Sequence, residues 1–200
     1  MIRTVIFDIG RVLLDFDWRT YLSSYHFDPE TEKRIAHAVF QNPSWIEFDR
    51  GILSTEQVID LFVKADPKLE EQIRLVCKTL YKTVTKLDYP IPWIRHLKEQ
   101  GLRVLYLSNY SDYYFRTTQF ALNFLSEMDG GIFSYRVHMV KPDHEIYHKI
   151  ISEYQLNPEE TVFLDDMPAN IEAARQCGLH GIVFSNLEQA KKELELLGVH

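Results

Sequence analysis

The chain has little cysteine, no excess of basic residues and no long apolar run. Its two cysteines, Cys77 and Cys177, lack the C-x-x-C spacing of zinc ligands and fit a reducing compartment. The net charge of −7 argues against binding to a nucleic-acid backbone, because such proteins gather Lys and Arg on one face. No segment reaches the roughly 18 apolar residues of a membrane span, and no basic-then-apolar leader precedes the first apolar run. We therefore expect a cytoplasmic protein that binds neither nucleic acid nor membrane.

Apolar and aromatic residues are plentiful. Hydrophobic residues make up 46% of the 200 residues and aromatic residues 13%, which is enough for a folded core and argues against disorder. This length suits one domain, or one domain with a modest insertion. The acidic net charge does not exclude small anionic substrates, because a local positive patch can hold them.

Four short apolar runs predict buried strands, and each ends at polar residues. The runs are 4–7, 102–107, 161–164 and 181–184, and helical patterns lie between them at 91–100, 145–154 and 170–176. Strands that alternate with helices predict an α/β fold with a parallel sheet covered on both faces. Ligands bind beyond the carboxyl ends of such strands, so the polar residues there are candidates for a functional site.

Residues 16–87 follow a different pattern, which predicts a helical insertion after the first strand. This region contains no convincing strand, and its apolar residues recur at helical spacing. A helix is expected to begin at Ser54 or Thr55 and to end at Asp66-Pro67, and another is expected over 69–81.

Asp8 ends the first apolar run and lies just before the turn residue Gly10. An unpaired buried carboxylate is costly, so a metal ion, a hydrogen-bonding network or catalysis would account for it. A carboxylate can attack phosphorus and form an acyl phosphate that water later hydrolyses. Mg²⁺ suits that reaction, because it screens the two anions from each other. The alternative is that Asp8 only caps a turn.

Ser108 and Asn109 directly follow the second strand, and Lys141 precedes a later helix. The hydroxyl and amide groups can donate hydrogen bonds to a phosphoryl oxygen, and the lysine can place a positive charge beside it. Each of these residues also has a simpler explanation, namely a turn that opens a helix or a solvated surface lysine.

Asp165 and Asp166 end the third apolar run, and Asn170 follows four residues later. Two adjacent carboxylates repel each other, and a divalent cation would relieve that repulsion. Asn170 could orient a carboxylate or a metal-bound water. An acidic helix N-cap explains one of the two carboxylates well and the pair less well.

The four motifs around Asp8, Ser108, Lys141 and Asp165 resemble, in order and spacing, those of the haloacid dehalogenase-like hydrolases. The resemblance covers essentially the whole chain. It implies a three-layer, Rossmann-like core made of residues 1–15 and 88–200, with residues 16–87 as an α-helical cap. It also implies a hydrolase that needs Mg²⁺, acts on a small phosphorylated metabolite and is a monomer or homodimer.

The resemblance assigns roles to individual residues as well. Asp8 would be the nucleophile that forms an aspartyl phosphate. Mg²⁺ would be held by Asp8, the main-chain carbonyl of Gly10 and the carboxylate of Asp166. Ser108, Asn109 and Lys141 would bind the phosphoryl group, with Ser108 and Lys141 also counted as catalytic, while Asp165 and Asn170 would support the site.

Gly10 departs from the family's D-x-D pattern, in which a second aspartate protonates the leaving oxygen and then activates water. General acid–base catalysis contributes about 10²–10⁴-fold, so its loss slows a reaction without abolishing it. Phosphates with a low-pKa leaving oxygen need that help least. The chain is similar to a branch of the family that shares this glycine and includes a phosphatase of a sugar 1-phosphate. We therefore expect a small-molecule phosphatase, with a sugar phosphate as the preferred substrate.

Other functions stay open. The vacant position at Gly10 is the best argument for a catalytically silent binding or regulatory protein. A 2-haloacid dehalogenase is less consistent, because those relatives need no metal and carry an aromatic residue at the position of Gly10. Asp15 and Asp17 could supply a proton but more simply mark the exit into the cap. In the cap, the residues before the turn at Gly51 include candidates for substrate contact, namely Trp45, Glu47, Asp49 and Arg50.

Overall fold

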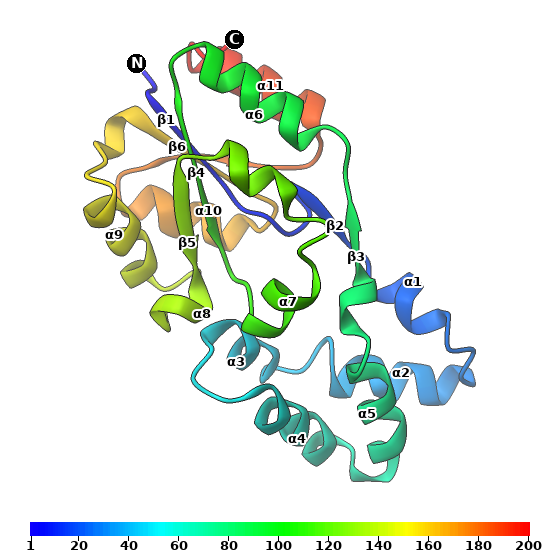
Figure 1. The fold of residues 1–200 in the computed structure, drawn as a ribbon. Helices are drawn as coiled ribbons and strands as arrows, with labels where there is room; N and C mark the ends of the chain where they lie inside the picture. The colour runs from blue at the N-terminus through cyan, green and yellow to red at the C-terminus, as the bar shows by residue number, and fades with distance from the viewer.

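The computed structural model describes residues 1–200 and is built around a five-stranded parallel sheet (Figure 1). In spatial order the strands are β5 (Gly130–Phe133), β4 (Arg103–Ser108), β1 (Thr4–Phe7), β6 (Thr161–Asp165) and β7 (His180–Val183). Every neighbouring pair in this sheet is parallel. The predicted α/β class is confirmed.

Alternate side chains of the strands enter two separate cores. Val5 and Phe7 pack in the core that contains α6 (Pro90–Glu99) and α11 (Leu187–Leu196). Ile6 packs in the other core, with α9 (His144–Glu153) and α10 (Pro168–Gln176). Because successive strand side chains point to opposite faces, a sheet buried on both faces needs apolar residues at every position. This requirement explains the continuous apolar runs and produces the three layers.

The sequence does not predict β5, because its first two residues are glycines and glycine is depleted in strands. Gly131 has a positive φ of +151°, and a Cβ atom there would lie 2.3 Å from the main-chain oxygen of Tyr106 in β4. The close approach of β5 to β4 therefore requires glycine at this position.

Residues 18–77 form a group of helices below the sheet in Figure 1. We call it the helical segment: α1 (Trp18–Ser23), α2 (Pro29–Ala38), α3 (Trp45–Arg50), α4 (Thr55–Ala65) and α5 (Glu70–Cys77). Ser54 caps α4, because its hydroxyl accepts from the Gln57 N–H while the Gln57 side chain accepts from the Ser54 N–H. The shorter elements are α7 (Asp112–Thr117), α8 (Ser134–Val137) and the 3-10 turns η1 (Pro67–Leu69), η2 (Leu80–Thr83), η3 (Asn123–Glu127) and η4 (Pro158–Glu160).

The prediction that 16–87 contains no strand is wrong at both ends of that region. β2 (Leu14–Phe16) pairs antiparallel with β3 (Val84–Lys86), with Leu14 opposite Lys86. Three-residue strands are too short to show an alternating pattern. This ribbon joins the helical segment to the sheet. The division of the chain into a core of residues 1–15 and 88–200 and a cap of residues 16–87 stays a prediction. None of the helices combines the length and the apolarity needed to cross a bilayer.

Candidate active site

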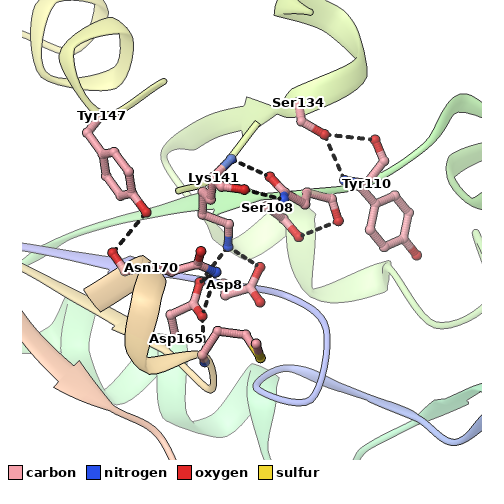
Figure 2. A network of polar contacts seen from close by, with 10 residues as sticks. Asp8, Ser108, Tyr110, Ser134, Lys141, Tyr147, Asp165 and Asn170 are labelled. Carbon is pink, nitrogen blue, oxygen red and sulfur yellow. Dashed lines mark hydrogen bonds and ion pairs between the residues drawn. The ribbon is translucent and has the colours of Figure 1, made fainter. Parts of the chain in front are cut away.

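Polar residues from three adjacent strands meet at the carboxyl edge of the sheet (Figure 2). Asp8 follows β1, Ser108 ends β4 and Asp165 ends β6, and all three side chains are buried. Lys141, from the loop before α9, reaches into the same cluster and is 2% exposed. The fold therefore brings together residues that are far apart in the sequence.

The Lys141 ammonium lies between two carboxylates. Its Nζ is 2.8 Å from Asp8 Oδ1 and 2.6 Å from Asp165 Oδ2. Burial lowers the pKa of Lys141 and the two carboxylates raise it, and the net pKa is above its usual value. The side chain is therefore a permanent cation beside Asp8.

Asn109 holds the main chain of Lys141. The Lys141 N–H donates to Asn109 Oδ1 at 2.8 Å, and Asn109 Nδ2 donates to the Lys141 carbonyl at 3.0 Å. The amide thus positions the lysine, and a contact of Asn109 with a phosphoryl group stays a prediction. The Ser108 hydroxyl donates to the Asn109 carbonyl at 3.5 Å, a long contact that leaves it able to turn toward a ligand.

Both carboxylate oxygens of Asp165 are bonded within the protein. Oδ2 accepts from Lys141 Nζ and Oδ1 from the Met167 N–H at 2.8 Å, while Asn170 Nδ2 lies 2.9 and 3.0 Å from the two oxygens. The Asn170 carbonyl in turn accepts from the Tyr147 hydroxyl at 2.9 Å. This network fixes Asp165 and fits the supporting role predicted for Asp165 and Asn170.

Asp8 has one poorly satisfied oxygen. Its Oδ1 contacts the Lys141 ammonium but makes no hydrogen bond of good geometry. Burial raises the pKa of Asp8 to about 6, against the opposing charge of Lys141, and Asp165 raises it further. A second cation at this oxygen would favour the ionised form.

The residues around Asp8 fit a hard divalent cation. Carboxylate oxygens of Asp8, Asp165 and Asp166 lie within 4.8 Å of one another. Because Asp165 is already saturated, Asp8 and Asp166 are the carboxylates left to bind a metal, and Gly10 lines the same cavity. Burial raises the pKa of Asp166 and Asp165 adds to this, while Arg11, with Nη1 3.8 Å from Asp166 Oδ2, lowers it. Oxygen donors of this kind suit Mg²⁺.

A cavity of about 410 Å³ opens over these carboxylates. The core contributes most of the polar residues of its lining, and the ribbon and helical segment contribute mainly apolar ones. The polar lining residues are Asp8, Arg11, Asp49, Asn109 and Asp166, and the apolar and aromatic ones include Phe16, Phe40, Trp45, Tyr110 and Tyr114. The site therefore has a charged floor below an apolar wall.

Two candidate residues from the sequence, Asp15 and Asp17, are not among the residues that line this cavity. Asp17 caps α1 by accepting from the N–H groups of Arg19 and Thr20, and the exposed Asp15 accepts from the Phe16 N–H. Neither lines the cavity, which fits the interpretation that they mark the exit into the helical segment.

Ser134 contributes to the site in a way the sequence does not predict. Its hydroxyl accepts from the Tyr110 N–H at 2.9 Å and donates to the Asp49 carbonyl at 2.6 Å, so it links the core to α3. Ser134 directly follows β5, as Ser108 ends β4. Prediction of β5 would have identified it as one more polar residue at the edge of the sheet.

Comparison with known proteins finds a hydrolase and a phosphatase among the relatives of this chain. A flavin mononucleotide hydrolase of Arabidopsis thaliana is 24% identical over 157 residues, which are 78% of this chain, and the match spans only 62% of the length of that relative. A D-ribitol-5-phosphate phosphatase of Bacteroides thetaiotaomicron is 22% identical over 98% of both chains.

Solved structures share the fold. An enzyme of the haloacid dehalogenase family from Bacteroides thetaiotaomicron, in complex with magnesium and inorganic phosphate, superposes with a TM-score of 0.71. It is 18% identical, and the match covers 92% of this chain and 95% of that one. The sequence model of the haloacid dehalogenase-like hydrolases matches residues 2–178. The chain belongs to this family of hydrolases.

Proposed function

We propose that the protein is a Mg²⁺-dependent phosphatase that hydrolyses small phosphomonoesters through a phosphorylated Asp8. The observation that carries this proposal is the buried contact of Asp8 with Lys141, beside the carboxylate of Asp166. A nucleophile, a fixed cation and a pair of metal-binding carboxylates are the groups that phosphoryl transfer needs. The relative named as a D-ribitol-5-phosphate phosphatase supports the same reaction.

The reaction follows from these positions. A carboxylate oxygen of Asp8 attacks phosphorus, the bond from phosphorus to the leaving oxygen breaks, and the alcohol departs. Water then attacks the phosphorus of the aspartyl phosphate, which releases inorganic phosphate and restores Asp8. Lys141 stabilises the negative charge on the transferring group, and Ser108 donates to one of its oxygens. When bound by Asp8, Asp166 and the Gly10 carbonyl, Mg²⁺ would screen the repulsion between nucleophile and phosphate.

The proposed substrate is a sugar or polyol phosphate. The phosphate would bind over the charged floor, and the rest of the molecule would lie against the aromatic wall that includes Trp45 and Tyr114. Aromatic rings provide flat apolar surfaces against which the C–H face of a sugar can pack. A cytoplasmic location and a monomeric or dimeric state belong to the same proposal.

The test is phosphate release by the purified protein with Mg²⁺. The panel contains sugar 1-phosphates, ribitol 5-phosphate and flavin mononucleotide, with Asp8→Asn as the inactive control and chelator as the metal-free control. Activity that needs both Asp8 and Mg²⁺ supports the proposal. Binding of Mg²⁺ and phosphate without turnover of any substrate would instead support a silent binding protein. Halide release from a 2-haloacid without metal would support a dehalogenase.

A further inference from the structure

We propose that Asp49, which α3 of the helical segment places over the core, is the general acid and base that the core lacks at Gly10. This inference rests on the proposed phosphatase function. It assigns a catalytic role to a residue outside the four motifs that identify the family.

Asp49 and Asp8 line the same cavity, one from the helical segment and the other from the sheet. Asp49 belongs to α3, whereas Asp8 follows β1 of the sheet. The cavity also contains Gly10 and Asp166, so a leaving oxygen on a phosphoryl group at Asp8 would face the helical segment. A proton donor in that segment has access to this oxygen.

The C-terminal end of α3 is held on the core at consecutive residues. The Asp49 carbonyl accepts from Ser134 Oγ at 2.6 Å, and the Arg50 carbonyl accepts from His138 Nδ1 at 3.0 Å. Gly51, at φ +68°, packs so closely on Tyr135 that an added Cβ atom would lie 2.7 Å from the Tyr135 Cβ. These contacts fix the position of Asp49 relative to the sheet.

The Asp49 carboxyl has no structural partner. No side-chain hydrogen bond contributes to the pKa of this carboxyl. Burial, and after it the negative charge of Asp8, raises the pKa of Asp49 to about 7, against the opposing charge of Lys141. The other titratable groups beside it are Tyr110 and Tyr114, whose own pKa values rise mainly through burial and partly through Asp49. Arg50 pairs with Glu47 and Asp143 instead. A half-buried, unpaired carboxyl that titrates near neutral pH suits both donation and acceptance of a proton.

The other polar groups of the cavity are less suitable. Asp8 and Asp166 serve as nucleophile and metal ligand in the proposed function, and the Arg11 guanidinium stays charged. The Tyr110 hydroxyl is bonded to Thr118 Oγ1 at 2.6 Å, and the Tyr114 hydroxyl to Thr83 Oγ1 at 3.1 Å. Among the residues that line the cavity, Asp49 is the one left with a free and titratable side chain.

The proton moves in two balanced steps. As Asp8 attacks, the electron pair of the phosphorus–oxygen bond goes to the leaving oxygen, which takes the proton of the Asp49 carboxyl. The resulting Asp49 carboxylate then accepts a proton from the water that attacks the aspartyl phosphate. Phosphate departs, the acyl phosphate bond breaks, and Asp8 and the Asp49 carboxyl return to their starting states.

The experiment compares two leaving groups in the Asp49→Asn variant. An alkyl phosphate from the active panel needs a proton on its leaving oxygen, whereas p-nitrophenyl phosphate does not need one at neutral pH. We expect Asp49→Asn to lower kcat/KM for the alkyl phosphate by about 10²–10³-fold. With p-nitrophenyl phosphate we expect a rapid burst of nitrophenolate followed by slow turnover, because formation of the aspartyl phosphate needs no acid but its hydrolysis still needs a base.

Two further variants test the assignment. Glu47→Gln removes a carboxylate from the same helix but outside the cavity, and both substrates should react as with the wild type. Gly10→Asp restores the second aspartate of the family motif, and its Cβ atom meets nothing within 4 Å. We expect kcat/KM for the alkyl phosphate to be at least about tenfold higher in the double variant Gly10→Asp, Asp49→Asn than in Asp49→Asn alone.

The outcomes separate the two proposals. If the wild type releases no product from any substrate with Mg²⁺, the phosphatase proposal fails and the role of Asp49 fails with it. If the wild type is active and Asp49→Asn matches it on both substrates, only the role of Asp49 is overturned. Equal losses on both substrates without a burst also overturn it, because they indicate structural damage.

Discussion

Lys141 is the residue on which the charge balance of the site depends. It is one buried cation among the three carboxylates of Asp8, Asp165 and Asp166. A buried ion pair contributes little net folding free energy when both partners are present, but removal of one partner leaves an uncompensated buried charge. The excess of carboxylates over cations also favours binding of a divalent cation.

Replacing this lysine should damage both stability and activity. We expect Lys141→Met to lower the free energy of unfolding by about 3–5 kcal/mol, because two buried carboxylates lose their counter-ion. Lys149→Met is the matched control, because the Lys149 side chain on α9 is 42% exposed and pairs with Glu153 at 3.0 Å. Its effect should stay within about 0.5 kcal/mol in the same urea titration. Equal effects of the two substitutions would contradict the prediction.

Asp49 should lower the stability of the folded protein near neutral pH, although we propose that it serves catalysis. Its folded pKa of about 7 lies above the ordinary 3.8, so the folded state binds the proton more tightly. That stabilisation is complete below pH 3.8 and is lost as the pH rises through 7. The Asp49→Asn variant has no charge to bury at this position. As the pH rises from 5 to 8, its free energy of unfolding should therefore increase by about 1–2 kcal/mol relative to that of the wild type. Urea unfolding in metal-free buffer measures this difference, and identical pH dependences would refute it.

Secondary structure elements differ in how far the sequence predicts them. β1, β4 and β6 are predicted because burial on both faces leaves a local apolar run. β5 is not predicted, because the requirement for Gly131 comes from Tyr106, which is distant in sequence. The floor of the site follows from strand ends and is predicted. Ser134 and Asp49 join it through the packing of α3 on the core, for which the sequence carries no local pattern, although it marks Asp49 as one of several candidates in the cap.

The attachment of α3 to the core can be tested at Gly51. Gly51→Ala places a Cβ atom 2.7 Å from Tyr135 and also carries the cost of a positive φ. Gly101→Ala is the matched control, because Gly101 has φ +81° but no neighbour within 4 Å of an added Cβ. Both variants should lose about 1 kcal/mol of stability from backbone strain.

Only Gly51→Ala should also lower kcat/KM and increase proteolysis of the helical segment, because it separates α3 from Tyr135. Comparable activity and proteolysis in the two alanine variants would show that this contact does not position the segment.

The whole molecule should respond to Mg²⁺ as a linked binding and folding equilibrium. A ligand that binds only the folded state stabilises it by about 2.7 kcal/mol at one hundred times its Kd. Because the pKa of Asp8 is about 6, Mg²⁺ must displace a proton below that pH. We therefore expect added Mg²⁺ to raise Tm strongly at pH 8 and weakly at pH 5. Asp166→Asn should abolish the rise at both pH values, and a Tm rise independent of pH would contradict the linkage.

The ribbon of β2 and β3 has a consequence for how this chain tolerates change. Leu14 and Lys86 are cross-strand neighbours, so the helical segment leaves the core and returns to it at a single place. The ribbon holds the two ends of the segment together, so the segment acts as a closed loop attached to the core. The entropic cost of closing a loop rises only slowly with its length. We therefore expect the sheet to tolerate changes of length in the connections between helices of the segment, provided that α3 keeps its contacts with Ser134 and Tyr135. The fold keeps Asp8 and Asp166 at the edge of the sheet, and it leaves the segment around α3 able to vary in length and shape.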